Sequence, residues 1–393
     1  MMSDAVLVLN AGSSSIKFGL FDISGTLPGL LCRGLLDEHE AKPGFTVTDA
    51  AGNQLFEKRR APADAMVDAP LADILDWSND YLAGGTLAIG HRVVHGGRDF
   101  HGPTEVTDRT LEAMAALTPL APLHQPRCLS PMRAIRSLRP GLTQIACFDT
   151  TFHLGLGPPV SRFAIPRRFE EMGIRRYGFH GLSFEFIANR LAEISPSLAE
   201  KRTVAAHLGN GASLCAMRSG RSVDTTMGLT PLDGLMMGTR SGAIDPGVLL
   251  YLQQQGMSLN DLDHMLYQES GLLGVSGLSA DVRVLLASND PRAVEAIELF
   301  TFRVAREVAA MANTLGGLDC LVFTGGIGEH SSEIRRQVCE RLRWLGAEID
   351  HSANDQASEC INPENSRVDV RVIPTSEETM IARHCSEILR AHG

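Results

Sequence analysis

A run of small polar residues that ends in a lysine offers the clearest chemistry in the sequence. It reads Asn10-Ala-Gly-Ser-Ser-Ser-Ile-Lys17 and follows a short apolar segment, residues 6–10. Glycine and serine let backbone N–H groups and hydroxyls approach an anion closely, and Lys17 places a positive charge beside them. The spacing is not that of a Walker A loop, and a strand rather than a helix is expected to follow. The run predicts either a phosphate-binding turn or an ordinary serine-rich hairpin turn.

Two other glycine-rich turns could bind the same kind of ligand. The first is His-Leu-Gly-Asn-Gly at residues 207–211, where Asn210 could donate a hydrogen bond to a phosphate oxygen. The second is Phe-Thr-Gly-Gly-Ile-Gly-Glu at residues 323–329, between an apolar strand and a helix expected over residues 331–342. Because glycine has no side chain, a nucleotide or its phosphates can approach the backbone closely at the end of such a strand. Each motif alone is weak, because α/β crossovers often use glycine only for close packing.

Two arginines lie among small residues that would leave them open to a ligand. Arg92 is in a short apolar strand that ends at Gly96 and Gly97, and Arg240 is in a small-residue loop before a helix that starts at Pro246. Either could bind a carboxylate or phosphate in a forked geometry. The alternative for each is a structural ion pair.

Four histidines require separate interpretations. His91 and His95 are expected to be packed strand residues. His124 is expected in a loop fixed by two prolines, and His180 just before a helix that begins near residue 183, where a helix N-terminus could meet a phosphate. We therefore take His124 and His180 as the candidate ligand-binding histidines.

Two acidic residues complete the set of candidates. Asp149 ends an apolar strand that starts at residue 144, and Glu377 lies near the C-terminus. Either could hold Mg²⁺ directly or through water. Since the chain carries a net charge of −10, its positive groups must be concentrated wherever it handles an anion, and nucleic acid and membrane surfaces are not expected partners.

The elements that must position these residues indicate an α/β chain of two domains. The 393 residues, 44% hydrophobic and 21% charged, are too many for one core. A strand, a small-residue turn and a second strand occur at residues 6–22 and again at 203–224, which predicts a duplicated design unless the two hairpins are coincidental. Helical spacing over residues 64–81, 110–117, 183–194 and 291–315 fills the intervals. A boundary is expected near residues 149 and 150.

The cysteines and the N-terminus bear on the compartment. The eight cysteines are scattered without metal-binding spacing, so they are predicted to be reduced thiols. The first ten residues lack the features of a signal peptide, and no apolar stretch is long enough to span a membrane. A cytoplasmic protein is expected.

Taken together, the motifs resemble those of the acetate kinase family, in the superfamily that also holds sugar kinases, Hsp70 and actin. The resemblance runs from about residue 6 to 382 and rests on eight segments: residues 9–17, 90–97, 148–153, 176–181, 207–213, 227–234, 237–242 and 323–329. It implies two duplicated actin-like, ribonuclease H-like domains with a βββαβαβα core and the active site in a cleft between them. The implied domains are 1–149 plus 379–393, with the phosphate loop and part of the acid pocket, and 150–378, for nucleotide binding and dimerisation.

The resemblance also implies an activity and a role for each candidate residue. The activity is reversible, direct in-line transfer of the ATP γ-phosphoryl group to acetate, with Mg²⁺ or substituting Mn²⁺, in a homodimer. The implied catalytic residues are Arg92, His124, Asp149, His180 and Arg240, and Asn10 and Glu377 are the implied metal residues. The acid would bind Arg92, Val94, Leu123, Phe179 and Pro231. ATP would bind Ser13, Ser15, Lys17, His207, Leu208, Gly209, Asn210, Gly211, Asp281, Val282, Arg283, Gly326, Ile327, Gly328 and Glu329.

Departures from the family pattern leave these catalytic positions intact but bear on substrate breadth. They are Ala243, Leu182, Phe184, Gln125, Arg127, Cys128, His330 and Ser376. A propionate or butyrate kinase is the nearest alternative, because one methylene is worth only about 1–3 kcal/mol of discrimination. A sugar or glycerol kinase would need a base, for which Asp149 is the candidate, and an ATP-binding sensor would need no catalytic residues.

Overall fold

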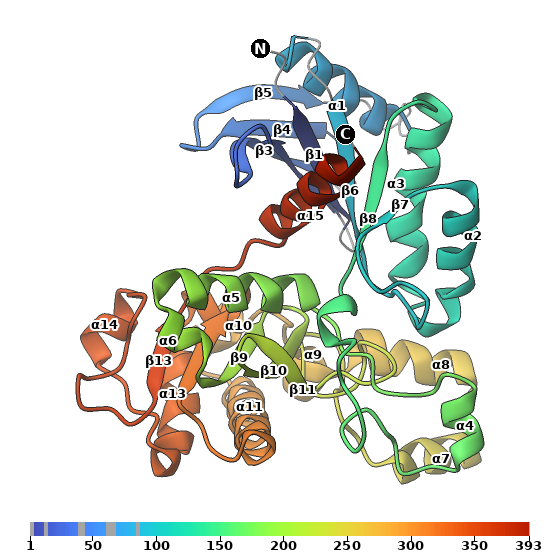
Figure 1. Cartoon of the computed structure of the whole chain (residues 1–393). Helices are drawn as coiled ribbons and strands as arrows, with labels where there is room; N and C mark the ends of the chain where they lie inside the picture. The colour runs from blue at the N-terminus through green and yellow to red at the C-terminus, as the bar shows by residue number, and fades with distance from the viewer. Residues whose placement is uncertain (1–3, 12–14, 38–43, 60–67, 84–86, 393) are drawn as a thin grey trace. The chain divides into compact units, whose positions relative to one another are not determined.

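The computed structural model describes residues 4–11, 15–37, 44–59, 68–83 and 87–392 (Figure 1). The chain divides into two compact units. Unit 1 comprises Met1–Thr151 and Ser376–Gly393, and unit 2 comprises Phe152–Thr375. Each unit is an α/β body built on its own sheet, with strands in the order β5-β4-β3-β2-β1-β6-β8-β7 in unit 1 and β11-β10-β9-β12-β13 in unit 2.

The sheet of unit 1 has a five-stranded centre with additions at both edges. β1 pairs antiparallel with β2, and β2 with β3, whereas β6 runs parallel to β1 and β8 parallel to β6. The hairpin β4–β5 extends one edge and the short β7 extends the other. The strands are β1 (Ala5–Ala11), β2 (Ser15–Asp22), β3 (Gly29–Asp37), β4 (Gly44–Asp49), β5 (Gln54–Arg59), β6 (Leu87–Val93), β7 (Thr104–Glu105) and β8 (Gln144–Phe148).

Helices cover this sheet because its central strands are apolar on both faces. One core joins Leu7, Leu9 and Ile89 of the strands to residues of α1 (Asp68–Tyr81) and α3 (Gln125–Leu138). The C-terminal helix α15 (Glu377–His392) packs on β1, β6 and neighbouring strands, and α2 (Asp108–Ala116) packs on α3. A Cβ at Gly90 of β6 would lie 2.5 Å from the Ile381 side chain, so glycine is what lets α15 approach the sheet closely.

The sheet of unit 2 repeats the centre of unit 1. β10 is antiparallel to β9 and β11 to β10, while β12 runs parallel to β9 and β13 parallel to β12. The five strands are β9 (Arg202–Leu208), β10 (Ala212–Arg218), β11 (Arg221–Thr225), β12 (Cys320–Thr324) and β13 (Asp369–Val372). Three antiparallel strands followed by two parallel ones therefore occur twice, and the predicted fold class, α/β with duplicated actin-like domains, is confirmed.

Unit 2 is rich in helices. α5 (Gly181–Ile194) packs its apolar side chains against β9, β10 and β12, and the long α11 (Pro291–Leu315) contacts β9, β10 and β11. The others are α4 (Arg167–Glu171), α6 (Pro196–Ala199), α7 (Pro246–Gln254), α8 (Leu259–His264), α9 (Gly271–Ser276), α10 (Val282–Leu286), α12 (Gly325–His330), α13 (Ser332–Leu342) and α14 (His351–Asp355).

The C-terminal helix returns to the first unit. α5 follows β8 of unit 1 in sequence but packs on the sheet of unit 2, and α15 follows β13 of unit 2 but packs on the sheet of unit 1. Figure 1 shows α15, the red helix, beside β1 and β6. The chain therefore passes from one unit to the other twice.

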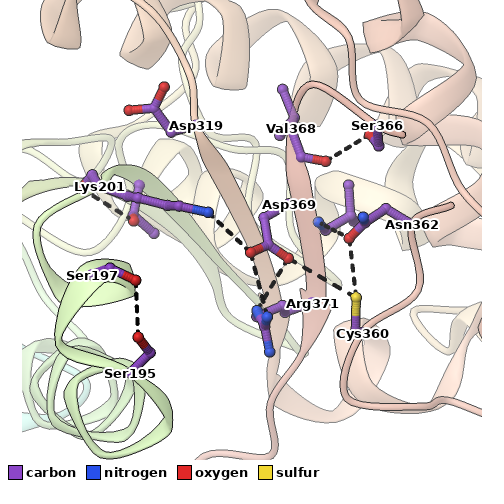
Figure 2. Close-up of polar contacts among 12 residues, drawn as sticks. Ser195, Ser197, Lys201, Asp319, Cys360, Asn362, Ser366, Val368, Asp369 and Arg371 are labelled. Carbon is purple, nitrogen blue, oxygen red and sulfur yellow. Dashed lines mark hydrogen bonds and ion pairs between the residues drawn. The ribbon is translucent and has the colours of Figure 1, made fainter. Parts of the chain in front are cut away.

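The exposed edge of the second sheet is protected by charge. β13 is its last strand, and Asp369 accepts a hydrogen bond from Lys201 Nζ at 3.2 Å while pairing with Arg371 Nε at 3.2 Å. Figure 2 shows both cations directed at this carboxylate, with Cys360 and Asn362 alongside. Asn362 Oδ1 accepts from the Val370 N–H at 2.7 Å. Charged side chains and a short covering segment hinder pairing with another chain at this edge.

Most predicted elements are present, with small shifts in their bounds. The helix predicted over residues 291–315 has those bounds, with Pro291 in its first turn and Gly316 in the left-handed conformation at its end. His124 was expected in a loop, and it lies in the turn that directly precedes α3, where it is the N-cap. Pro126 fits the first turn of α3 because the N–H that proline lacks has no partner there in any helix.

Candidate active site

The carboxyl ends of three parallel strands bring candidate residues of unit 1 together. Asn10 is near the end of β1, Arg92 is near the end of β6, and Asp149 follows β8. Since β1, β6 and β8 are adjacent and parallel, these ends lie at one edge of the sheet, where open α/β sheets bind ligands. The sequence did not give this adjacency, which depends on the strand order.

Arg92 is held by a two-pronged ion pair with Asp149. Its NH2 lies 2.6 Å from Oδ2 and its Nε 3.1 Å from Oδ1 of the carboxylate. The Arg92 side chain is 17% exposed and that of Asp149 only 1%. Burial alone would lower the pKa of Arg92, but the charges of Asp149 and Glu377 outweigh it and raise that pKa, so the guanidinium stays charged.

The start of α15 adds two carboxylates to this group. Asn10 Nδ2 donates to Glu377 Oε2 and to Glu378 Oε1, each at 3.1 Å. Glu377 Oε2 also lies 3.4 Å from Arg92 Nε. Glu378 was missed in the sequence, although two adjacent acids in a first helical turn could have drawn attention to it.

The side-chain oxygens of Asn10, Glu377 and Glu378 are of the kind that Mg²⁺ prefers as ligands. Magnesium prefers oxygen ligands, keeps several waters, and usually takes only one or two carboxylates together with substrate phosphates. Among the residues that the structure describes, no cluster of three or more His, Cys, Asp or Glu side chains forms a ready metal cage. Asn10, Glu377 and Glu378 therefore suit a hydrated ion bound jointly with a nucleotide.

The predicted acid-pocket residues of unit 1 lie directly after β6 and shortly before α3. Val94 is 4% exposed and directly follows β6, while Leu123 is 39% exposed just before α3. The buried Gln125, at the start of α3, accepts from the His95 N–H at 3.2 Å and donates to the His95 carbonyl at 3.1 Å. This departure from the family pattern thus fixes the loop after Val94. His91 and His95 are buried, as expected.

In unit 2, two predicted histidines form a stacked pair. The rings of His180 and His207 are 4.3 Å apart and nearly parallel, at 22°. His180 Nδ1 lies 2.8 Å from Ser213 Oγ, and His207 Nδ1 lies 2.9 Å from Ser183 Oγ. His180 is the N-cap of α5 with a left-handed backbone, φ 56°.

Arg240 and the glycine turn after β9 complete the group in unit 2. Arg240 NH1 donates to the Pro231 carbonyl at 2.7 Å. A Cβ at Gly211 would lie 3.1 Å from Arg240 Nη2 and 3.5 Å from His180 Nε2, so this glycine borders both side chains. A Cβ at Gly238 would lie 2.0 Å from Asn210 Oδ1, which explains why glycine stands beside that side chain. Phe179, next to His180, is buried.

The third glycine-rich motif is a short helix, α12, tied to the turn after β9. Gly325 has φ +75°, and a Cβ there would lie 2.8 Å from the Leu208 carbonyl oxygen. Glu329 Oε1 accepts from the Gly325 N–H at 2.8 Å and the Thr375 N–H at 3.1 Å. The buried Arg335, unnoticed in the sequence, donates to the carbonyls of Gly328 and Glu329 at 2.8 Å each. Ile327 lies within the same helix.

Several predicted nucleotide residues remain predictions. Ser13 lies outside the described residues, Ser15 begins β2, and Lys17 is an exposed residue of β2 paired with Asn10. Asp281 caps α10 and forms an ion pair of 2.6 Å with Arg283, and Val282 is buried. A Cβ at Gly326 would have no atom within 4 Å, whereas one at Gly209 would lie 3.3 Å from the Gly211 carbonyl oxygen. The structure thus gathers one candidate group in each unit, and the joint action of Arg92 and Arg240 stays a prediction.

Comparison with known proteins identifies the family. The model of the acetokinase family matches residues 5–383. The chain is 51% identical over 390 residues to an acetate kinase of Rhodopseudomonas palustris, covering 98% of each chain. It also resembles the crystal structures of a propionate kinase from Francisella tularensis (39% identity, TM-score 0.88, 97% and 98% of the chains) and of Porphyromonas gingivalis acetate kinase (35%, 0.85, 98% and 100%). The predicted family is confirmed: the chain belongs to the acetokinase family.

Proposed function

We propose that this protein transfers the γ-phosphoryl group of ATP to acetate, reversibly, giving acetyl phosphate and ADP. The observation that carries the proposal is the set of charges in unit 1, where the guanidinium of Arg92 is fixed by Asp149 beside Asn10 and Glu377. A carboxylate oxygen of acetate bonds to the γ-phosphorus while the bond from that phosphorus to the β,γ-bridging oxygen breaks, and the electron pair leaves with ADP.

The chemistry needs cations more than it needs a base. Acetate is ionised at pH 7, since carboxyl groups have pKa values of about 4 to 5. Two unit charges 4 Å apart repel by about 4 kcal/mol at an effective dielectric of 20. Arg92 and Arg240 would neutralise this repulsion and, with His124 and His180 as donors, stabilise the charge spread over a loose transition state. Bound Mg²⁺, or Mn²⁺ in its place, held by Asn10 and Glu377, would neutralise the phosphates.

Asp149 argues against transfer to a hydroxyl. A sugar or glycerol kinase needs a carboxylate that can take the proton of the acceptor hydroxyl. Both oxygens of Asp149 receive hydrogen bonds from Arg92, and the residue is almost fully buried. A carboxylate so engaged is a poor proton acceptor, so direct in-line transfer to an already ionised acid suits the site better.

A hydroxamate assay with acetate, propionate and butyrate would test the proposal, because hydroxylamine traps acyl phosphates. We expect MgATP-dependent acyl phosphate formation, fastest with acetate. Propionate kinase is the second candidate, since the chain is 39% identical to a structure of that name. Preference for propionate would favour it, and phosphorylation of a polyol without any acyl phosphate would refute both.

We further propose that the protein is a homodimer in the cytoplasm. The apolar helix α7, Pro-Gly-Val-Leu-Leu-Tyr-Leu-Gln-Gln, has no buried residue, and Leu250 and Tyr251 are 61% and 59% exposed. A second copy that covers this face would remove the apolar surface from water. All eight cysteines are free thiols, in keeping with a reducing compartment. No helix in the described part of the chain is long and apolar enough to cross a membrane.

A further inference from the structure

A buried histidine that phosphoryl transfer does not use lies directly behind His180. His153 ends the short turn that follows β8 and is only 1% exposed. Its Nδ1 lies 2.8 Å from Ser222 Oγ and its Nε2 lies 3.0 Å from the Phe179 carbonyl oxygen. The rings of Phe152 and Phe184 pack against it edge-on, each at 5.7 Å.

The partners of His153 determine its tautomer. A carbonyl oxygen can only accept, so Nε2 must carry the proton, and Nδ1 must accept from the Ser222 hydroxyl. Ser222 Oγ in turn lies 3.4 Å from Cys215 Sγ, which donates to it. Burial lowers the pKa of His153 to about 4, despite the opposing hydrogen bond to Phe179, so the ring is neutral at neutral pH.

The carbonyl that His153 holds belongs to an unusual stretch of backbone. It forms the peptide between Phe179 and His180, where His180 has φ 56° and Gly178 has φ +79°. A left-handed backbone is disfavoured for a residue with a Cβ, so His180 needs outside support. A Cβ at Gly178 would lie 2.6 Å from the His153 ring, which shows how closely the ring fits against this turn.

We propose that His153 is a positioning residue, which holds the Phe179–His180 peptide so that His180 is directed at the transferring phosphoryl group. The His180 ring is fixed by Ser213 and by stacking on His207, and its backbone is fixed by His153. This inference rests on the proposed function, because it assumes that His180 acts on the phosphoryl group and Phe179 on the acid.

The proposal predicts which kinetic constants change. The peptide that His153 holds carries one candidate acid-pocket residue and one candidate catalytic residue. Of the nucleotide candidates, His207 stacks on the His180 ring, but its own ring is held separately by Ser183. Asn210 and Glu329 have other partners, namely Gly238 and the α12 turn. Loss of His153 should therefore lower kcat and raise the KM for acetate while the KM for ATP stays nearly unchanged.

The test compares His153→Phe, which removes both hydrogen bonds, with His153→Gln, whose amide can still donate to the Phe179 carbonyl. We expect kcat to fall about 10- to 100-fold and the acetate KM to rise about tenfold in His153→Phe, as for a buried carbonyl left without its donor. The ATP KM should stay within about twofold, and His153→Gln should recover part of the loss. Phe300→Leu, buried in α11 away from the site, controls for reduced stability.

Other outcomes separate this inference from the proposed function. Equal rises in the KM values for acetate and ATP, or equal losses in His153→Phe and His153→Gln, would overturn the positioning role. If His153→Phe does not fold, Ser222→Ala should show the same pattern with smaller changes, and no change there would also overturn it. ¹⁵N NMR of the wild-type imidazoles reads the tautomer without any activity: an Nε2-protonated His153 supports the inference, and an Nδ1-protonated one refutes it. Wild-type protein that cannot phosphorylate acetate would refute the proposed function instead.

Discussion

At the scale of single residues, the candidate site of unit 1 contains an arginine that is mostly buried and paired with carboxylates. Arg92 is compensated by Asp149, which accepts from its Nε and Nη2. Its Nη1 donates to Asn10 Oδ1, and its Nε also lies near Glu377 Oε2. Its donors outnumber the two oxygens of Asp149, since a guanidinium carries five N–H groups. A carboxylate–arginine pair of this kind orients the guanidinium and keeps it charged, as a phosphoryl-binding group requires.

Replacing either arginine should abolish most of the activity. We expect Arg92→Ala or Arg240→Ala to reduce kcat by about 10³-fold or more, because each would stabilise charge on the transferring group much as an arginine finger does. Steady-state rates of acetyl phosphate formation provide the measurement. Since Arg92→Ala leaves the buried Asp149 without this partner, circular dichroism must first show that the variant is folded, and near-normal turnover in a folded variant would exclude the role.

The acid pocket gives a prediction about specificity. Val94→Ala should widen the pocket and raise the propionate-to-acetate ratio of kcat/KM by up to about tenfold, since a methylene is worth about 1–3 kcal/mol. The neighbouring Val93→Ala removes the same atoms from a core that packs around Phe148, so it should lower stability and leave the ratio unchanged. A ratio that is the same in both variants and the wild type would show that Val94 does not line the pocket.

Residues with distinctive neighbours in sequence could be predicted, and residues defined by distant neighbours could not. Arg92, Asp149 and His180 stand in glycine-rich or strand-end motifs that mark them. His153 ends one of the segments that carry the family resemblance, residues 148–153, but its contact with Ser222, 69 positions away, could not be predicted from that segment. In the sequence, Arg335 is not distinguished from other helical arginines. Its role depends on α12 and α14, because it donates to the carbonyls of Gly328 and Glu329 and to Asn354.

At the scale of elements, the short helix α12 is stabilised at both ends. The Glu329 carboxylate accepts from the Gly325 N–H at its start, and the buried Arg335 donates to carbonyls at its end. A carboxylate at a helix start and a cation at a helix end each complement the unpaired backbone groups there. The same carboxylate binds the N–H of Thr375, two residues before Glu377, so the nucleotide turn and the segment that leads to the metal candidate share one anchor.

Weakening that anchor should affect nucleotide binding first. We expect Glu329→Gln to raise the KM for ATP about tenfold with a smaller effect on kcat, because hydrogen bonds to a charged group contribute about 1.5–3 kcal/mol. Glu333→Gln on α13 makes the same chemical change in a residue that pairs with Arg336 instead, and serves as the control. Equal KM values for ATP in the two variants would argue against the anchor.

Elements with strong periodicity were predictable, and peripheral ones were not. Apolar residues recur at helical spacing over the 25 residues of α11, which starts at a proline and is followed by a glycine. The helix was predicted with the correct bounds. β5 is a contrasting case. Five of its six residues are exposed and the sixth is only partly buried, so no alternation of buried and exposed residues marks it as a strand. Its strand conformation comes from pairing with β4.

At the scale of the whole molecule, buried histidines should make stability depend on pH. Burial lowers the pKa of His91 and of His153 from 6.5 to about 4. Between these values the unfolded chain binds protons that the folded chain does not, so the free energy of unfolding should fall as the pH falls from 6.5 to 4, by up to about 3 kcal/mol for each histidine. Thermal unfolding at pH 7 and pH 4.5 should show a smaller difference in His91→Gln than in the wild type. The control, His351→Gln at an exposed position, should leave this pH difference unchanged. If the buried-histidine variants also leave it unchanged, the buried histidines are not its cause.

The proposed dimer gives a prediction for assembly. Leu250→Glu places a charge on the exposed apolar face of α7 and should convert a dimer into a monomer, because an unpaired charge is costly to bury. Light scattering after size-exclusion chromatography measures the mass. Trp344→Glu alters another exposed apolar side chain and should leave the dimer intact. A wild-type protein that is monomeric, or a Leu250→Glu variant that is still dimeric, would exclude α7 as the interface.

The return of the C-terminal helix α15 to unit 1 has a consequence for synthesis on the ribosome. Most of the first unit emerges early, but the helix that covers one side of β1 and β6 is encoded by the final residues, Glu377–His392. Val6 and Val8 of β1 are buried in the folded protein. Their sheet therefore stays incompletely covered until the second unit and α15 have been synthesised. The part of the protein that is translated first is thus the part that finishes folding last.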